Sequence, residues 1–135
     1  ITQRQQIMSD KFTVEIISPD KSIFNSEANE VTIPSYEGQM GILKDHIPLI
    51  TFLRPGIISI QNQEKKYFVE EGTVEFSNNR LLILTSTARD LKELDQNIIE
   101  DLLNQSEKKL SDNNFSDKEK YLLTYKISTL KEISQ

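Results

Sequence analysis

Apolar and polar residues alternate in short runs from Phe12 to about residue 88 of this chain. Such alternation is typical of β-strands with one buried face, because successive side chains of a strand point to opposite sides. Turn residues interrupt the runs at intervals of roughly 6 to 12 positions, which is the spacing of all-β domains. The pattern predicts about eight to ten strands in an antiparallel β-sandwich or flattened barrel. No helical pattern interrupts the strands, which argues against βαβ units and a parallel sheet.

The apolar positions of the C-terminal part recur instead every three or four residues, with the period of an amphipathic α-helix. The stripe comprises Leu91, Leu94, Ile98, Ile99, Leu102 and Leu103. It predicts a first helix from about Asp95, a suitable N-cap, to Leu110. Ser116 and Glu119 have the spacing of a capping box and predict a second helix that ends near Ile133. Two helices with so short a connection form an antiparallel hairpin, and neither is long enough to be stable in isolation.

The chain therefore divides into three parts of different character. We expect residues 1–10 to be a disordered N-terminus or sequence added upstream, with Met8 as the biological first residue. Residues 11–90 form the predicted β-sandwich domain, and residues 91–135 form the predicted helical hairpin domain. The expected fold class is thus mainly β plus α, a sandwich followed by two helices.

Turn-forming residues are concentrated in one stretch, residues 30–59. It contains three of the four prolines and three of the four glycines, which alternate with short apolar runs. Proline fixes φ and glycine permits positive φ, so the stretch predicts strands joined by tight, specified corners. Its punctuating residues are Pro34, Glu37-Gly38, Gly41-Ile42-Leu43, His46, Pro48-Leu49 and Leu53-Arg54-Pro55-Gly56. This set, at this spacing, resembles the signature of the epsilon subunit of the rotary F-type ATP synthase.

That resemblance implies a non-catalytic rotor-stalk subunit rather than an enzyme. In this family the sandwich lies at the foot of the central stalk, against the gamma subunit and the membrane c-ring, and helps couple ion-driven rotation to ATP synthesis. Residues 36–46 match the region that faces the ring and the stalk. The candidate partner-binding residues are Tyr36, Glu37, Gln39, Met40, Leu43, Lys44 and His46. Gln39 is neutral where several relatives have an acid, which removes a salt bridge to the ring but leaves an amide that can form a hydrogen bond.

The start of the first predicted helix bears on nucleotide binding. Some epsilon subunits bind ATP there through a motif that resembles Ile/Leu-Asp-x-x-Arg-Ala. This chain has Leu94 and Asp95, but Ile98 replaces the arginine and Ile99 follows it. Isoleucine cannot supply the planar guanidinium that binds phosphate oxygens. The sequence therefore predicts weak or absent ATP binding, and no cofactor.

The second predicted helix carries candidate regulatory residues. In some relatives the hairpin extends along gamma into the catalytic alpha/beta head and blocks ATP hydrolysis through basic residues. The corresponding candidates here are Lys118, Lys120, Lys126 and Lys131. Asp117, Glu119 and Glu132 lie among them, and mixed charge of this kind is also typical of a solvated helix face with local ion pairs. Both interpretations of the hairpin stay open, as does the choice between a docked and an extended state.

The residue inventory excludes most catalytic chemistry. The chain has no cysteine and a single histidine, His46, so we expect no catalytic site and no metal site. A structural hydrogen bond is the expected role of His46, which lies in a turn-rich segment. A net charge of −5 argues against a nucleic-acid partner. No apolar run reaches the roughly 18 residues of a transmembrane helix.

Two other functions remain as alternatives. One is an ATP-sensing regulatory subunit of the same architecture, against which the missing arginine argues. The other is a free-standing β-sandwich binding module, in which residues 37–44 are only a corner of the sandwich. For the preferred rotor-stalk function we expect a peripheral membrane location, on the cytoplasmic face of the bacterial inner membrane or the equivalent organelle face. The absence of a recognisable transit peptide favours a bacterial or organelle-encoded subunit.

Overall fold

The computed structural model describes residues 10–61 and 63–134 of the chain. Over those residues it contains ten strands, a short 3-10 helix and two α-helices. The strands are β1 (Phe12–Ile17), β2 (Ser22–Ala28), β3 (Glu30–Ser35), β4 (Gly38–Leu43), β5 (Leu49–Leu53), β6 (Gly56–Ile60), β7 (Lys65–Val69), β8 (Gly72–Ser77), β9 (Arg80–Leu84) and β10 (Arg89–Asp90). The helices are η1 (Leu91–Glu93), α2 (Gln96–Leu110) and α3 (Asp117–Ile133). The predicted N-terminal part, residues 1–10, lies outside the described residues except for Asp10.

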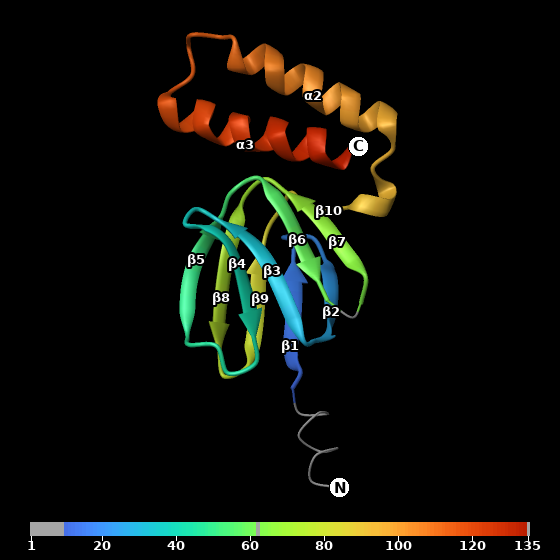
Figure 1. The fold of residues 1–135 in the computed structure, drawn as a ribbon, viewed down its shortest axis with the longest axis vertical. Helices are drawn as coiled ribbons and strands as arrows, with labels where there is room; N and C mark the ends of the chain where they lie inside the picture. The colour runs from blue at the N-terminus through green and yellow to red at the C-terminus, as the bar shows by residue number, and fades with distance from the viewer. Residues whose placement is uncertain (1–9, 62, 135) are drawn as a thin grey trace, which may run out of the picture.

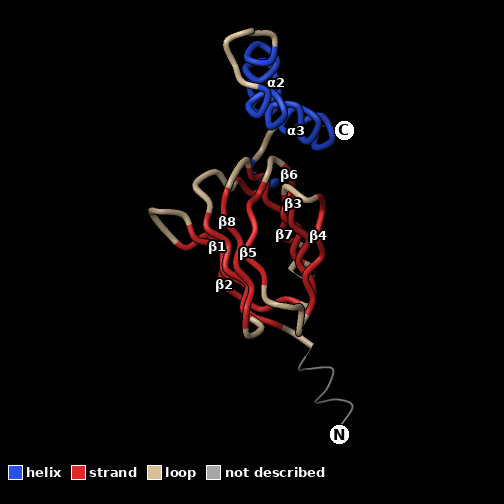
Figure 2. Tube along the Cα trace, turned by 90° about the vertical axis from the view of Figure 1, so that its left-hand side faces the viewer, coloured by secondary structure: helices blue, strands red, loops and turns tan. Residues whose placement is uncertain are grey.

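The strands form one continuous sheet that folds over on itself into two layers (Figure 1, Figure 2). Their order is β10-β7-β6-β3-β5-β8-β9-β1-β2, and β4 pairs with β3 outside this path. The predicted sandwich is confirmed, but the expectation of purely antiparallel pairing is wrong at one place. Strands β1 and β9 are parallel, from Thr13 opposite Arg80 to Ile17 opposite Leu84. Parallel neighbours need a long connection, and here the intervening strands β2 to β8 provide it instead of a helix.

The space between the two layers holds the main hydrophobic core. Strand alternation places side chains as the sequence predicts, with Val14 and Ile16 buried and Thr13 exposed on β1. Phe12 and Phe76 pack edge to face in this core, with ring centroids 5.6 Å apart. Within the described residues, α2 and α3 contribute no side chain to it. The sandwich is therefore stabilised mainly by its own strands.

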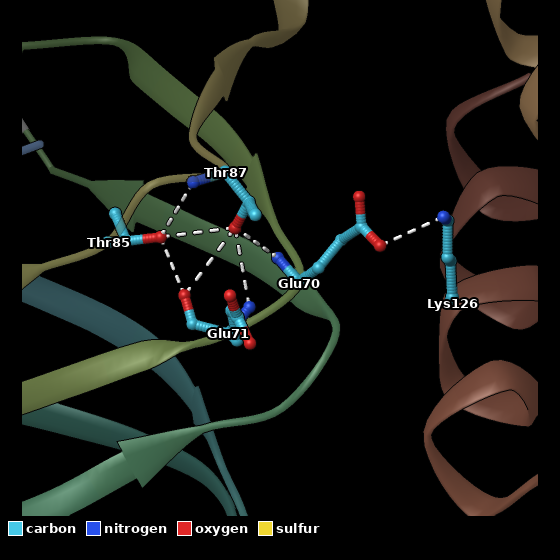
Figure 3. A network of polar contacts seen from close by, with 5 residues as sticks. All are labelled: Glu70, Glu71, Thr85, Thr87 and Lys126. Atoms are coloured by element: carbon cyan, nitrogen blue, oxygen red, sulfur yellow. Dashed lines mark hydrogen bonds and ion pairs between the residues drawn. The ribbon is translucent and has the colours of Figure 1, made fainter. Parts of the chain in front are cut away.

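Strand β9 ends at Leu84, and the residues that follow it form side-chain hydrogen bonds instead of continuing the strand. Thr85 donates its hydroxyl to the Glu71 carbonyl at 2.6 Å. Thr87 Oγ1 accepts the backbone N–H groups of Glu70 and Glu71 at 3.0 and 3.3 Å (Figure 3). Threonine side chains that bond to the backbone in this way compete with a regular strand ladder. They tie the end of β9 to the turn between β7 and β8.

Both predicted helices are confirmed, together with their caps. Asp95 is the N-cap of α2 and accepts a backbone N–H bond at 2.9 Å. Ser116 and Glu119 form the predicted capping box at the start of α3. Leu91, the first residue of the apolar stripe, lies before α2 in the separate 3-10 helix η1, which Asp90 caps.

The helical hairpin lies across one end of the sandwich, with α3 nearer to the strands than α2 (Figure 1). Its apolar residues meet the outer face of β7 in a second, smaller core of Phe68, Ile99 and Leu130. Tyr67 and Val69 on the same strand face the main core. Alternation along β7 thus assigns neighbouring side chains to two different cores.

Candidate functional site

Most of the signature residues determine how strands β3 to β6 fold. Pro34 packs directly on Gly56, where an added Cβ would lie 2.5 Å from the Pro34 Cβ. Gly38 has a φ of +123°, which side-chain-bearing residues rarely adopt. Ser35 completes this turn, because its hydroxyl donates to the Gly38 carbonyl at 2.7 Å and accepts the Glu37 N–H at 3.2 Å. These signature positions are explained by backbone geometry, without any partner.

The candidate segment 36–46 is not a single loop. Its middle is strand β4, Gly38–Leu43, which pairs along the whole of β3. Near one end of the strand, Gln39 lines a crevice beside α3. Beyond the other end, Asp45 is bonded to Asn79 in the turn between β8 and β9. The structure therefore separates the candidate residues along the length of the sandwich instead of gathering them at one corner.

The candidates differ in exposure as the alternation of a strand requires. The exposed ones are Tyr36, Glu37, Gln39 and Leu43. Lys44 is half-buried, and Met40 packs against the main core. The Nδ1 atom of His46 lies 2.7 Å from the Ile47 carbonyl oxygen, and its ring packs edge to face on Phe76. Met40 and His46 thus have structural contacts, and for His46 these match the expected role.

Sequence reasoning missed an exposed apolar surface on the outer side of β5, β9 and β1. Ile50 is 76% exposed, Phe52 55% and Leu84 46%. Phe52 and Leu84, together with Ile17 and Tyr36, line a groove of about 710 Å³. We call these five residues the apolar face. A signal was present in the sequence, because β5 is apolar on both of its sides although a sandwich needs only one.

Two polar contacts join α3 to the sandwich. The Arg54 guanidinium lies 4.0 Å from the centroid of the Tyr125 ring, and its Nη1 donates to the Tyr121 hydroxyl at 3.4 Å. Lys126 Nζ lies 2.8 Å from Glu70 Oε1 (Figure 3). Arg54 and Tyr121 are 67 positions apart in the chain, so no local pattern could have indicated their contact. We call these five side chains the junction residues.

Asp90 lies where the last strand meets η1. Its carboxylate accepts the Lys92 N–H at 2.9 Å and pairs with Lys65 Nζ at 3.1 Å. The Lys92 backbone N–H, and then Lys65, lower the pKa of the Asp90 carboxyl. The hydrogen bond and charge of Asp90 in turn raise the pKa of Lys65, and burial raises the pKa of the neighbouring Tyr67. Asp90 therefore anchors the connection between the sandwich and the hairpin.

The four residues of the degenerate ATP motif have other tasks in the structure. Asp95 uses its carboxylate to cap α2. Leu94 packs against the smaller core, and Ile99 is buried in it. Ile98 is 37% exposed and has no polar side-chain atom for a phosphate. Capping and packing are sufficient to explain this segment.

The four candidate regulatory lysines do not form one basic surface. Lys126 is paired with the sandwich, and Lys131 Nζ lies 3.9 Å from Glu107 Oε1 of α2. Lys118 is exposed and Lys120 half-buried near the start of α3. Lys126 and Lys131 therefore pair with residues outside α3, so these two contacts are not the local ion pairs within one helix that mixed charge suggests.

In the described part of the chain, residues 10–61 and 63–134, no three His, Cys, Asp or Glu side chains come together as a metal site requires. Neither helix in these same residues is long and apolar enough to cross a membrane. The features that remain are an exposed apolar face, the outer side of β4 and a helical hairpin.

The sequence is similar to those of known proteins. Residues 11–90 match the family model described as "ATP synthase, Delta/Epsilon chain, beta-sandwich domain". The ATP synthase epsilon chain of Pelagibacter ubique is 45% identical over 130 residues, which cover 94% of this chain and 100% of that one. The chloroplastic ATP synthase epsilon chain of Pyropia yezoensis is 35% identical over 116 residues, which cover 84% of this chain and 86% of that one.

Solved structures share the fold. A chain in the cryo-EM structure of the Euglena gracilis mitochondrial ATP synthase (OSCP/F1/c-ring) superposes with a TM-score of 0.71 and 19% identity, over 90% of this chain and 78% of that one. A chain in the cryo-EM structure of the Tetrahymena thermophila mitochondrial ATP synthase (central stalk/c-ring) superposes with a TM-score of 0.66 and 17% identity. The match covers 91% of this chain and 96% of that one. At these identities the likeness is one of fold alone.

Proposed function

The chain belongs to the ATP synthase epsilon chain family, whose members are non-catalytic subunits of that enzyme, and from this premise we propose that it acts in the central stalk. There it links the gamma subunit to the membrane c-ring and couples ion-driven rotation to ATP synthesis. Its location is peripheral, on the cytoplasmic face of the bacterial inner membrane or the equivalent organelle face. Such a subunit needs no active site, but it needs surfaces that hold two partners firmly.

The apolar face is the observation that carries this proposal. Ile50 and Phe52 stay 76% and 55% exposed although β5 lies inside the sheet order. Contiguous exposed apolar surface on a folded domain marks a place where another molecule binds. Covering it gains roughly 25 cal/mol for each Å² of apolar area removed from water, and buried aromatic anchors often dominate such interfaces. We assign the apolar face to the gamma subunit.

The outer side of β4 is the second proposed surface, and we assign it to the c-ring. Glu37, Gln39 and Leu43 are exposed on it. The Gln39 amide can both donate and accept hydrogen bonds, so it suits a polar loop without a salt bridge. Met40 packs against the main core and His46 packs on Phe76, so we assign neither to the ring contact.

Nucleotide sensing is not part of the proposed function. The carboxylate of Asp95 is engaged as a helix cap, and Ile98 offers no donor to a phosphate. Isothermal titration of the full chain with ATP is the direct test. An affinity in the low-micromolar range would contradict the proposal and favour the sensing alternative.

Regulation of ATP hydrolysis by the hairpin is a further part of the proposal. Because Lys126 is engaged by the sandwich in the docked arrangement, we expect only weak inhibition of hydrolysis from a docked hairpin. Deleting residues 95–135 from the subunit in the assembled enzyme tests this. A large rise in hydrolysis after the deletion would show that the hairpin is a strong inhibitor.

Co-elution with a matching gamma subunit on a sizing column tests the proposed stalk function. We expect a stable one-to-one complex with the wild-type chain and an affinity at least about tenfold weaker with Phe52→Glu, because a charge cannot be buried at the centre of an apolar interface. Leu43→Glu is the matched control, since Leu43 and Phe52 are both 55% exposed but Leu43 lies outside the apolar face. Separate peaks for two folded wild-type proteins would overturn the proposal and favour a free-standing binding module.

A further inference from the structure

The apolar face lies on a layer of the sandwich whose register can be followed from strand to strand. Strands β5, β8, β9 and β1 are consecutive neighbours in the sheet order, and β5, β8 and β1 lie side by side in Figure 2. Residues directly opposite each other in paired strands point to the same side of a sheet. The register therefore sorts the outward-facing side chains of this layer into rows that cross all four strands.

The first of these rows carries most of the apolar face. Phe52 lies opposite Thr73, Thr73 opposite Leu84, and Leu84 opposite Ile17. All four residues line the groove of about 710 Å³. Three of the four side chains are apolar, so a partner can fill this groove with an apolar side chain of its own.

The second row brings a carboxylate next to the groove. Ile50 lies opposite Glu75, and Glu75 opposite Leu82. Two residues along each strand separate this row from the first, a distance of roughly 7 Å. Glu75 is exposed and stands between two apolar side chains of the neighbouring strands. Its charge is therefore part of the surface that the apolar face presents.

The second row ends in another carboxylate, Glu15, which lies opposite Leu82 and differs from Glu75 in its contacts. Its Oε1 lies 3.0 Å from the Arg80 Nη2, and its side chain is 18% exposed. Glu75 lines a second hollow of about 360 Å³ together with Arg80 and Leu82. Among the ion pairs within residues 10–61 and 63–134, however, none includes Glu75. The neighbouring cation is thus engaged by Glu15, and the Glu75 carboxylate is left to water.

A partner on the apolar face cannot avoid Glu75. Strand β8 lies between β5 and β9, so a surface that covers Ile50, Phe52 and Leu84 also covers β8 between them. Burial of apolar side chains is favourable, but burial of an ionised carboxylate without a partner group is strongly unfavourable. A protein that binds here must therefore supply a cation for Glu75 or lose much of its affinity.

We propose that Glu75 is a specificity-determining residue for the gamma subunit and binds a lysine or arginine of gamma beside the apolar side chain that enters the groove. The inference rests on the proposed function, in which the apolar face binds gamma. The separation of roughly 7 Å between the rows is close to one turn of a helix or two residues of a strand, so one regular segment of gamma can present both groups. Complementary charge then selects the partner and fixes its orientation, which apolar contact alone does poorly.

The affinity of the full chain for a matching gamma subunit, measured by isothermal titration, tests the role of Glu75. Glu75→Gln keeps the shape of the side chain and removes its charge, and we expect it to bind gamma about tenfold more weakly. Glu75→Lys places two cations together and should weaken binding about a hundredfold. Glu64→Gln and Glu64→Lys are the matched controls, because Glu64 is exposed in the turn between β6 and β7, away from the apolar face. Both controls should leave the affinity unchanged.

Variants of gamma identify the cation from the other side. In a set of gamma variants that each replace one surface lysine or arginine by glutamate, one should lose affinity for the wild-type chain and regain it for Glu75→Lys. The proposal is wrong if Glu75→Gln binds gamma as tightly as the wild type. It is also wrong if no gamma variant restores the binding of Glu75→Lys, a result that would leave Glu75 to water or to Arg80 of its own chain.

The outcomes separate this inference from the proposed function. If the folded wild-type chain and gamma form no complex, the stalk function and the role of Glu75 are both wrong. If the wild-type chain binds gamma and Phe52→Glu weakens binding while Glu75→Lys does not, the apolar face holds gamma without help from Glu75. In that case only the present inference fails.

Discussion

The sandwich and the hairpin belong to one chain but are held together by different means. The sandwich has a core between two layers, built from many fully buried side chains. The hairpin has a core of three buried residues, one of them, Phe68, supplied by β7. Local opening depends on how much apolar surface each region buries. The sandwich is thus the stable body, and the hairpin is a module whose order depends on it.

Replacing Phe68 should weaken the attachment of the hairpin to the sandwich, and we expect this change to have the largest effect on the hairpin's stability. Phe68→Ala leaves a cavity under the hairpin and costs about 3 kcal/mol, a typical value for a buried phenylalanine. Because Phe68 faces α2 and α3 rather than the main core, the loss should fall on the hairpin. Amide hydrogen exchange should speed up by about a hundredfold in the helices and change little in the strands.

Phe76→Ala is the matched control for that prediction. Phe76 is also buried, but it packs on Phe12 in the main core. Its loss should lower the exchange protection of the strands and the helices together, because the hairpin has no support once the sandwich opens. Equal loss of protection in both regions with Phe68→Ala would mean that the two regions unfold as one unit.

A substitution at Gly56 tests the stability of the sandwich in the same comparison. The Cβ of alanine would lie 2.5 Å from the Pro34 Cβ, and neither atom can move without shifting backbone. We expect Gly56→Ala to lower the free energy of unfolding by about 2 kcal/mol, within the range for overpacked sites. Gly41→Ala is the control, because its Cβ would meet only the movable carboxylate of Glu30, at 3.1 Å. Urea unfolding of the sandwich measures the free energy of unfolding of both variants. Equal decreases in the two variants would contradict the steric argument.

The two regions also differed in what could be predicted from the sequence. The ends of both helices followed from local signals, because Asp95 and the Ser116 box are caps whose partners lie within three residues. The parallel pairing of β1 with β9 has no local signal, since it depends on the path of all the strands between them. Likewise, only the docked structure brings Glu70 to Lys126. The same limit applied to the candidate site, where β4 separated residues that the sequence suggested were neighbours.

The cap of α3 offers a smaller change confined to the hairpin. In Ser116→Ala the Glu119 N–H loses its acceptor, at 3.2 Å in the wild-type chain, and the helix end loses about 1 kcal/mol. Thr124→Ala is the control, because its hydroxyl bonds back to the Lys120 carbonyl within the helix and alanine favours the helix more. Helix exchange rates should rise for Ser116→Ala only. An equal rise in the exchange rates of the strands would mean that the sandwich and the hairpin do not have separate stabilities.

The smallest expected effect is the change in hairpin stability at acid pH, which depends on Asp90 between the two regions. Because the folded pKa of Asp90 lies below its ordinary value of 3.8, its stabilising contribution is present above about pH 4 and is lost as the pH falls through the folded pKa. Lys65 stays protonated over this range, so Asp90 is the member of this pair that titrates there. Asp90→Asn should therefore weaken the hairpin at pH 7 and flatten the acid dependence of its exchange rates. The effect is small because the pair is partly exposed. Equal acid dependence in the variant and the wild type would assign the acid sensitivity to other carboxylates.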